Sequence, residues 1–100
     1  MTNEYYSQHG MTAAGFAHYE AKAKGMSVAE LSYAIRDLRE TCDIWNREAR
    51  ETGFVCEKLG FWTDEMHIYC DERRRRELVA AAAEAVEVLG DVELDGGANL

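Results

Sequence analysis

Apolar residues recur every three or four positions between residues 27 and 52, which places them on one face of a helix. This seam consists of Leu31, Ile35, Leu38, Cys42, Trp45 and Ala49. Ser27, followed three residues later by Glu30, matches the capping box that begins a helix, and Gly53 is suited to end one. The pattern therefore predicts a long helix from Ser27 to Thr52.

A shorter helical pattern precedes this one. Phe16, Tyr19 and Ala23 are spaced by three and four, Thr12 can cap the helix, and Gly25 can end it. Residues 1–10 are polar, contain two tyrosines and show no periodicity, so they are predicted to form a loose arm.

A second long helix is predicted from Thr63 to Leu89. Thr63 can cap it, and Asp64 and Glu65 in its first turn complement the positive end of the helix dipole. Its apolar residues form one stripe before the arginines and a different stripe after them. The second stripe comprises Leu78, Ala82, Ala85 and Leu89. Gly90 is expected to close the helix and residues 91–100 to form a frayed acidic tail.

These elements predict an all-α fold in one domain of residues 1–100: an antiparallel helical hairpin of two long helices plus a short N-terminal helix. The absence of proline agrees with long helices. A loop centred near Glu57 would place Cys42 level with Cys70, Trp45 with His67, and Leu31 with Ala81. A fold of this size buries little surface, so a homodimer is also expected.

The formal net charge is −8, and most of the excess lies near the carboxyl terminus. The predicted acidic surface comprises Glu84, Glu87, Asp91 and Glu93. It is either a solvated face or a mimic of nucleic-acid phosphate. The chain has no long apolar stretch and no basic, apolar leader, so a cytoplasmic protein without membrane contact is expected.

Candidate chemistry is sparse. Cys42, Cys56 and Cys70 are an odd number without close spacing, which favours free thiols. Asp64, His67, Cys70 and Asp71 could share a helix face, but the cysteines lack the close pairs of a zinc site, so neither metal nor cofactor is expected. No glycine-rich phosphate loop or nucleophile turn is present, which argues against an enzyme.

The preferred partner surface lies beside the predicted loop. Four consecutive arginines wrap around a helix, and two aromatic residues precede them; arginine and aromatic side chains are enriched at binding hot spots. The predicted partner-binding residues are Phe61, Trp62, Arg73, Arg74, Arg75 and Arg76. The arginines are flanked by acidic residues, which disfavours general binding to nucleic-acid duplexes.

The stretch from Tyr19 to Glu77 resembles a group of short phage-encoded proteins of unassigned activity. The matching residues are Tyr19, Lys22, Met26, Ser27, Glu30, Leu31, Ile35, Asp37, Gly60, Phe61, Trp62, Asp64, Glu65, Met66, His67, Tyr69, Cys70, Glu72 and the arginines. The resemblance implies a phage or prophage origin, and small acidic phage proteins often block host proteins, including CRISPR effectors and transcription factors.

Together, these features predict a non-enzymatic interaction protein, phage-encoded, that binds and inhibits a host protein. The alternative is a small regulatory module that binds nucleic acid or a nucleotide through Arg73–Arg76, because guanidinium groups bind phosphate bidentately. The sequence names neither the partner nor the surface that binds it.

Overall fold

The computed structural model describes residues 4–7 and 10–97, with side chains described up to residue 87. In chain order it contains the strands β1 (Tyr6–Ser7) and β2 (Gly10–Met11), followed by the helices α1 (Ala13–Lys24), α2 (Val28–Thr52) and α3 (Leu59–Gly97). The fold is therefore mainly helical, with two long helices and a short N-terminal one, as predicted. The small β ribbon was not predicted.

The ends of α1 and α2 agree with the predictions. Thr12 caps α1 by accepting a hydrogen bond from Gly15 N, and Gly25 follows its last residue. At the start of α2, Ser27 Oγ accepts from Glu30 N at 3.0 Å, and Glu30 Oε1 accepts from Ser27 N at 2.8 Å, which completes the capping box. Gly53 adopts a left-handed conformation with φ of 80°, where glycine is favoured, and ends the helix.

The predicted start of α3 is wrong, because the helix begins at Leu59 rather than after Thr63. Thr63 Oγ1 donates to Leu59 O at 2.8 Å, so its hydroxyl bonds the preceding turn instead of capping the helix. The earlier start places the Phe61 ring in the core. At the other end, Gly90 does not terminate the helix, and its backbone continues to Gly97 through the predicted frayed region.

The N-terminal residues are also better packed than predicted. β1 and β2 pair antiparallel, with Tyr6 opposite Met11. Tyr5 and Tyr6 are half-buried against the core. Gly15 is buried where α1 crosses this segment, and a side chain there would collide with Tyr5 O and Met11 Cγ. The described part of the predicted loose arm thus covers one side of the core.

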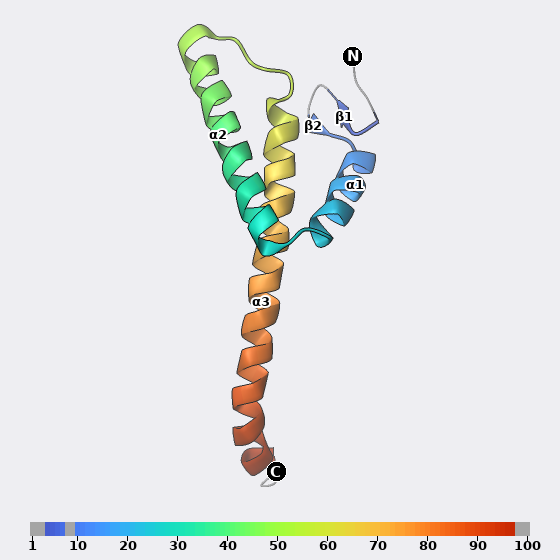
Figure 1. Ribbon diagram of the computed structural model, residues 1–100, viewed down its shortest axis with the longest axis vertical. Helices are drawn as coiled ribbons and strands as arrows, with labels where there is room; N and C mark the ends of the chain where they lie inside the picture. The colour runs from blue at the N-terminus through green and yellow to red at the C-terminus, as the bar shows by residue number, and fades with distance from the viewer. Residues whose placement is uncertain (1–3, 8–9, 98–100) are drawn as a thin grey trace.

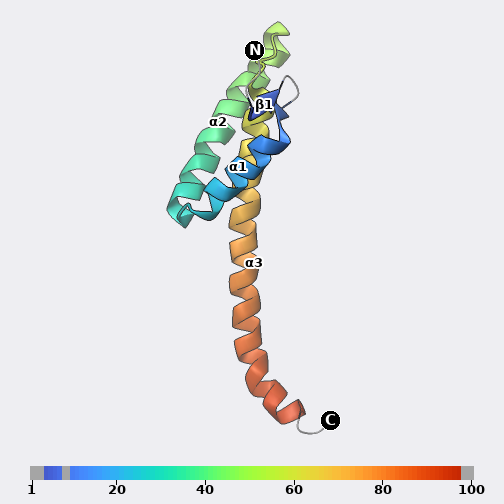
Figure 2. The same ribbon diagram turned by 90° about the vertical axis from the view of Figure 1, so that its right-hand side faces the viewer.

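The three helices form a bundle at one end of an elongated molecule of 67 × 29 × 24 Å. α1 and α2 both contact the N-terminal half of α3, which continues past them (Figures 1 and 2). α2 and α3 run in opposite directions and diverge toward the loop that joins them (Figure 1). Close packing of these two helices along their whole length is therefore absent.

The predicted register of α2 on α3 is wrong. Cys42 Sγ lies 3.7 Å from Thr63 Oγ1, about two helical turns before Cys70. Trp45 packs on Phe54 instead of lying level with His67, and Ala81, the predicted neighbour of Leu31, is exposed. The cause is the loop, which descends from the end of α2 before α3 begins (Figure 1), so that earlier α3 residues face α2.

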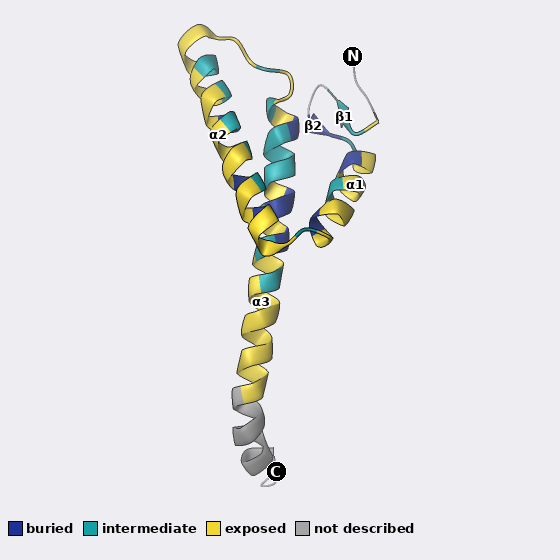
Figure 3. Ribbon diagram, in the orientation of Figure 1, coloured by how far each residue is buried: buried dark blue, intermediate teal, exposed yellow. Residues whose placement is uncertain are grey.

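The core is small and lies entirely within the bundle. Its buried members are Met11, Ala23, Leu31, Ile35, Phe61, Ile68 and Tyr69. The two largest side chains with less than 2% exposure are Tyr69 and Leu31. Figure 3 shows burial concentrated where the three helices meet, while the far half of α3 is exposed up to the last side chain described.

Because Leu31 has no exposed surface, Leu31→Ala should lower the free energy of unfolding by about 2–5 kcal/mol, the range for removing a buried leucine. Tyr33→Ala, on the same helix at 66% exposure, is the matched control and should change it by less than about 0.5 kcal/mol. Urea unfolding measures both. Equal losses in the two variants would contradict this assignment of the core.

Candidate functional site

Phe61, one of the predicted partner-binding residues, is not available to a partner. Its side chain is only 9% exposed and lies in the core. The rings of Tyr6 and Tyr19 pack edge-on against it, with centroids 5.4 and 5.5 Å away. Trp62 is half-buried against the same core. Phe61 stabilises the contact between α3 and the N-terminal segment, and its prediction as a partner-binding residue is corrected.

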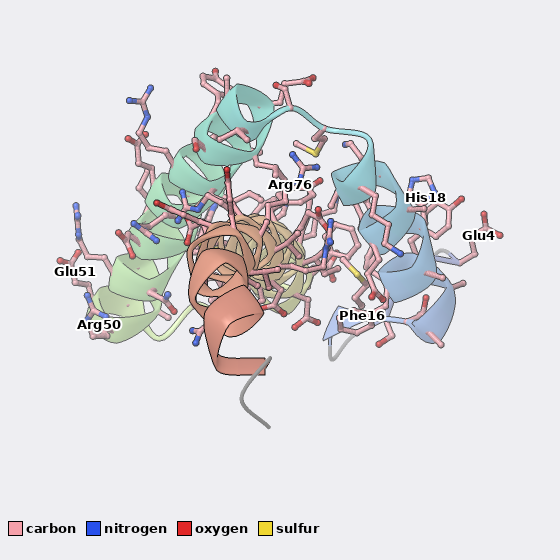
Figure 4. All side chains as sticks on the ribbon, turned by 90° about the horizontal axis from the view of Figure 1, so that it is seen from below. Glu4, Phe16, His18, Arg50, Glu51 and Arg76 are labelled. Carbon is pink, nitrogen blue, oxygen red and sulfur yellow. The ribbon has the colours of Figure 1, made fainter. Side chains whose placement is uncertain are left out.

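The four arginines divide between structural and exposed roles. Glu72, only 7% exposed, accepts hydrogen bonds from Arg75 at 3.1 and 2.7 Å and from Arg76 at 2.7 Å. Arg76 Nη2 also donates to Ala23 O at 3.1 Å and to Lys24 O at 3.3 Å. In Figure 4, Arg76 extends from α3 toward the end of α1. Arg76 is therefore a structural residue rather than part of a free patch.

Glu72 owes its ionisation to these contacts. Hydrogen bonds from Arg75 and Arg76 lower its pKa from 4.5 to about 2, against the opposing effect of burial. The same pairing raises the pKa of Arg75. A buried carboxylate is stable only when it is paired in this way, and its single negative charge compensates one of the two arginine charges that bind it. This leaves Arg74 exposed and Arg73 half-buried, a weaker cationic surface than the sequence suggested.

The residues proposed for metal or thiol chemistry do not converge. Asp64 Oδ2 accepts a hydrogen bond from Met11 N at 3.0 Å and so anchors β2 to α3. Cys42 is buried beside Thr63, whereas His67 is exposed. Within the described residues, no group of three or more histidine, cysteine or acidic side chains could hold a metal ion. Cys42, Cys56 and Cys70 are all free thiols.

A groove between α1 and α3 was not predicted from the sequence. It encloses about 410 Å³ and is lined from α1 by Phe16, Glu20, Ala23 and Lys24, and from α3 by His67, Ile68, Asp71, Glu72 and Arg75. Its lining combines apolar side chains with charges of both signs. Phe16, Glu20 and Ala23 are spaced by four and three in the sequence, which places them on one helix face. The same spacing is equally typical of a helix face that is fully packed and has no groove.

An aromatic patch marks the loop between α2 and α3. We define the tip patch as Trp45, Phe54 and Val55. The rings of Trp45 and Phe54 lie 6.1 Å apart between centroids, Phe54 is 57% exposed and Val55 is 65% exposed. The two long helices diverge toward this end of the bundle (Figure 1). Two apolar residues directly after the helix-ending Gly53 were the sequence signal for this patch.

The predicted acidic surface is described only in part. Glu84 and Glu87 are exposed on α3, as expected, whereas the side chains of Asp91 and Glu93 lie outside the described residues. None of the helices, over the part of the chain that the structure describes, is both long and apolar enough to cross a membrane.

The chain was compared with known protein families, curated proteins and solved structures. No family model, no curated protein and no solved structure matches this chain.

The ionised state of Glu72 makes stability depend on pH. Because its pKa is lowered, its contribution is complete above pH 4.5 and is lost as the pH falls toward 2. Glu72→Gln should lower stability at pH 7 by about 2 kcal/mol and flatten the acid side of the profile. Thermal unfolding from pH 7 to 2 measures this, with Glu77→Gln, exposed on the same helix, as control. Parallel acid profiles for wild type and Glu72→Gln would refute the role of Glu72.

Proposed function

We propose that this chain is a non-enzymatic interaction protein that binds another protein through the tip patch. The observation that carries the proposal is the exposed apolar pair of Phe54 and Val55, with Phe54 packed against the half-buried Trp45. Moving large apolar side chains out of water lowers the free energy. Aromatic residues are also enriched among the few residues that dominate binding energy at protein interfaces. A protein partner recovers this free energy by covering the patch.

The surroundings of the tip patch favour a protein over a nucleic acid as its partner. The adjoining helix end and loop carry Arg47, Glu48, Arg50, Glu51, Glu57 and Lys58, which balance in charge. Figure 4 shows Arg50 and Glu51 side by side at the end of α2. Nucleic-acid sites are much more positive. At the arginine run, Glu72 already pairs with Arg75 and Arg76, which weakens the alternative of phosphate binding.

The proposed origin of the partner is inferred only from the resemblance to short phage proteins. On that basis, the partner is a host protein such as a CRISPR effector or a transcription factor, and binding inhibits it. The tip patch supports binding to a protein, and the resemblance supplies the expectation of inhibition. The inhibitory part is therefore tested separately, by the activity of the partner once it is captured.

The variant Phe54→Ser, Val55→Ser should abolish partner capture, because it removes exposed apolar surface and leaves the core intact. The matched control is Ile44→Ser, which removes another exposed apolar side chain, 57% exposed on α2, away from the core seam. Tagged proteins are incubated with lysate of the cells in which the chain occurs, and captured proteins are identified by mass spectrometry.

The proposal expects one captured protein to be retained by the wild type and Ile44→Ser and reduced at least about tenfold with the double variant. Unfolding free energies of both variants should lie within about 0.5 kcal/mol of the wild type. Equal capture by both variants would place the partner elsewhere. The absence of any protein retained by the wild type would refute the proposed function.

A further inference from the structure

Phe54 lies near one end of the elongated molecule. The end of α2 and the loop that follows it form that extremity of the long axis in both views (Figures 1 and 2). The side chain of Phe54 is 57% exposed there, and that of the next residue, Val55, is 65% exposed. The molecule therefore presents a large aromatic side chain to solvent at one of its two ends.

Two local constraints fix the backbone at Phe54. Gly53 N donates to Ala49 O at 3.0 Å, and Gly53 turns the chain out of α2 with a φ of 80°, a conformation that favours glycine. The Thr52 hydroxyl donates to Glu48 O at 2.9 Å and accepts from Phe54 N at 3.2 Å. This hydroxyl therefore ties the backbone of Phe54 to the last turn of α2.

The ring of Phe54 is supported from α2 by Trp45. Trp45 is half-buried, and the centroids of the two rings lie 6.1 Å apart at an interplanar angle of 51°, which is within the range of favourable aromatic contacts. The ring contact adds to the two backbone constraints. Together they hold Phe54 in the position in which a partner meets it.

The exposure of Phe54 specifies the shape of the surface that can cover it. A flat surface would contact only the outermost part of the ring, whereas a concave surface contacts its sides as well and gains more dispersion energy. The side chains that dominate binding energy usually lie in well-packed pockets from which water is excluded. Arg50 and Glu51 at the adjoining helix end carry opposite charges (Figure 4), and they suit the polar rim of such a contact.

We propose that Phe54 is a preformed anchor that inserts into an apolar pocket of the partner protein, and that Thr52, Gly53 and Trp45 are its positioning residues. The proposal rests on the proposed function, because Phe54 belongs to the tip patch. Ordering a mobile side chain on binding costs free energy. A side chain that is already ordered avoids this cost, so the positioning residues raise the affinity through Phe54.

A larger side chain tests the pocket. Phe54→Trp adds apolar surface, which a flat partner surface would cover with equal or tighter binding, whereas a pocket fitted to a phenyl ring excludes the larger indole. The protein captured by the wild type is purified and titrated by calorimetry, and its dissociation constant should rise at least about tenfold for Phe54→Trp. Ile44→Trp, which enlarges an exposed side chain outside the tip patch, is the control and should change it by less than about threefold.

Substitutions that keep the ring of Phe54 test the positioning residues. Thr52→Val removes the hydroxyl, whereas Thr52→Ser keeps it. Gly53→Ala strains the backbone, because its φ is 80°, although the added carbon would meet no atom within 4 Å. The matched control is Gly25→Ala, where φ is −87° and the added carbon makes an ordinary contact at 3.6 Å. Thr52→Val and Gly53→Ala should each weaken binding at least about threefold, and the two controls should not.

The position of Phe54 is also measured in the free full chain. Nuclear magnetic resonance should show Overhauser contacts between the rings of Phe54 and Trp45, and coupling constants of a single χ1 rotamer at Phe54. Trp45→Ala should average these couplings and weaken binding at least about tenfold. Trp45→Phe restores an aromatic support and should restore both the single rotamer and the affinity, which a general loss of stability would not explain.

An averaged Phe54 rotamer in the wild type would overturn the inference, whether or not a partner is captured. Equal or tighter binding by Phe54→Trp would also overturn it, as would wild-type affinity in Thr52→Val, Gly53→Ala and Trp45→Ala. Self-association of the wild type that Phe54→Ser, Val55→Ser abolishes, measured by analytical ultracentrifugation, would make a second copy the occupant and overturn it too.

The pocket and the proposed function fail separately. If Phe54→Ser, Val55→Ser abolishes capture but Phe54→Trp binds as tightly as the wild type, the tip patch remains the binding surface and the pocket is refuted. If the wild type captures no protein, the proposed function and the pocket are both refuted, and the rotamer of Phe54 in the free chain still decides the role of the positioning residues.

Discussion

Glu72 is the buried carboxylate on which the contact between the end of α1 and α3 depends. It holds Arg76 in place, and Arg76 in turn donates to Ala23 O and Lys24 O at the end of α1. The last carbonyls of a helix have no partner within that helix. Ala23 O already accepts from Met26 N, and Arg76 adds a donor to it and one to Lys24 O, which ties α1 to α3. The position of this contact also defines the end of the bundle, because every residue of α3 from 77 to 87 is exposed. The groove therefore lies just inside this contact, and the exposed part of α3 begins just outside it.

The limited core explains why so much of α3 lies outside the bundle. A chain of this size buries a smaller fraction of its surface than a larger domain does, and here seven buried residues form the core cluster. They come from β2 and from all three helices, so the apolar residues of the short elements are used to cover the first half of α3. Leu78, Val79 and Val86 lie beyond the reach of these elements and stay more than half exposed.

Local signals in the sequence predicted what local interactions determine. The capping box of Ser27 and Glu30, the Leu31 seam and Gly53 fixed the bounds of α2 because each acts within a few residues. Thr63 has the same capping propensity, yet α3 begins at Leu59, since burial of Phe61 under Tyr6 and Tyr19 depends on contacts distant in the sequence. The β1–β2 ribbon was not predicted, and the register of α2 on α3 was predicted wrongly, for the same reason. Among the candidate site residues, spacing could not distinguish Arg76, which binds the end of α1, from the exposed Arg74.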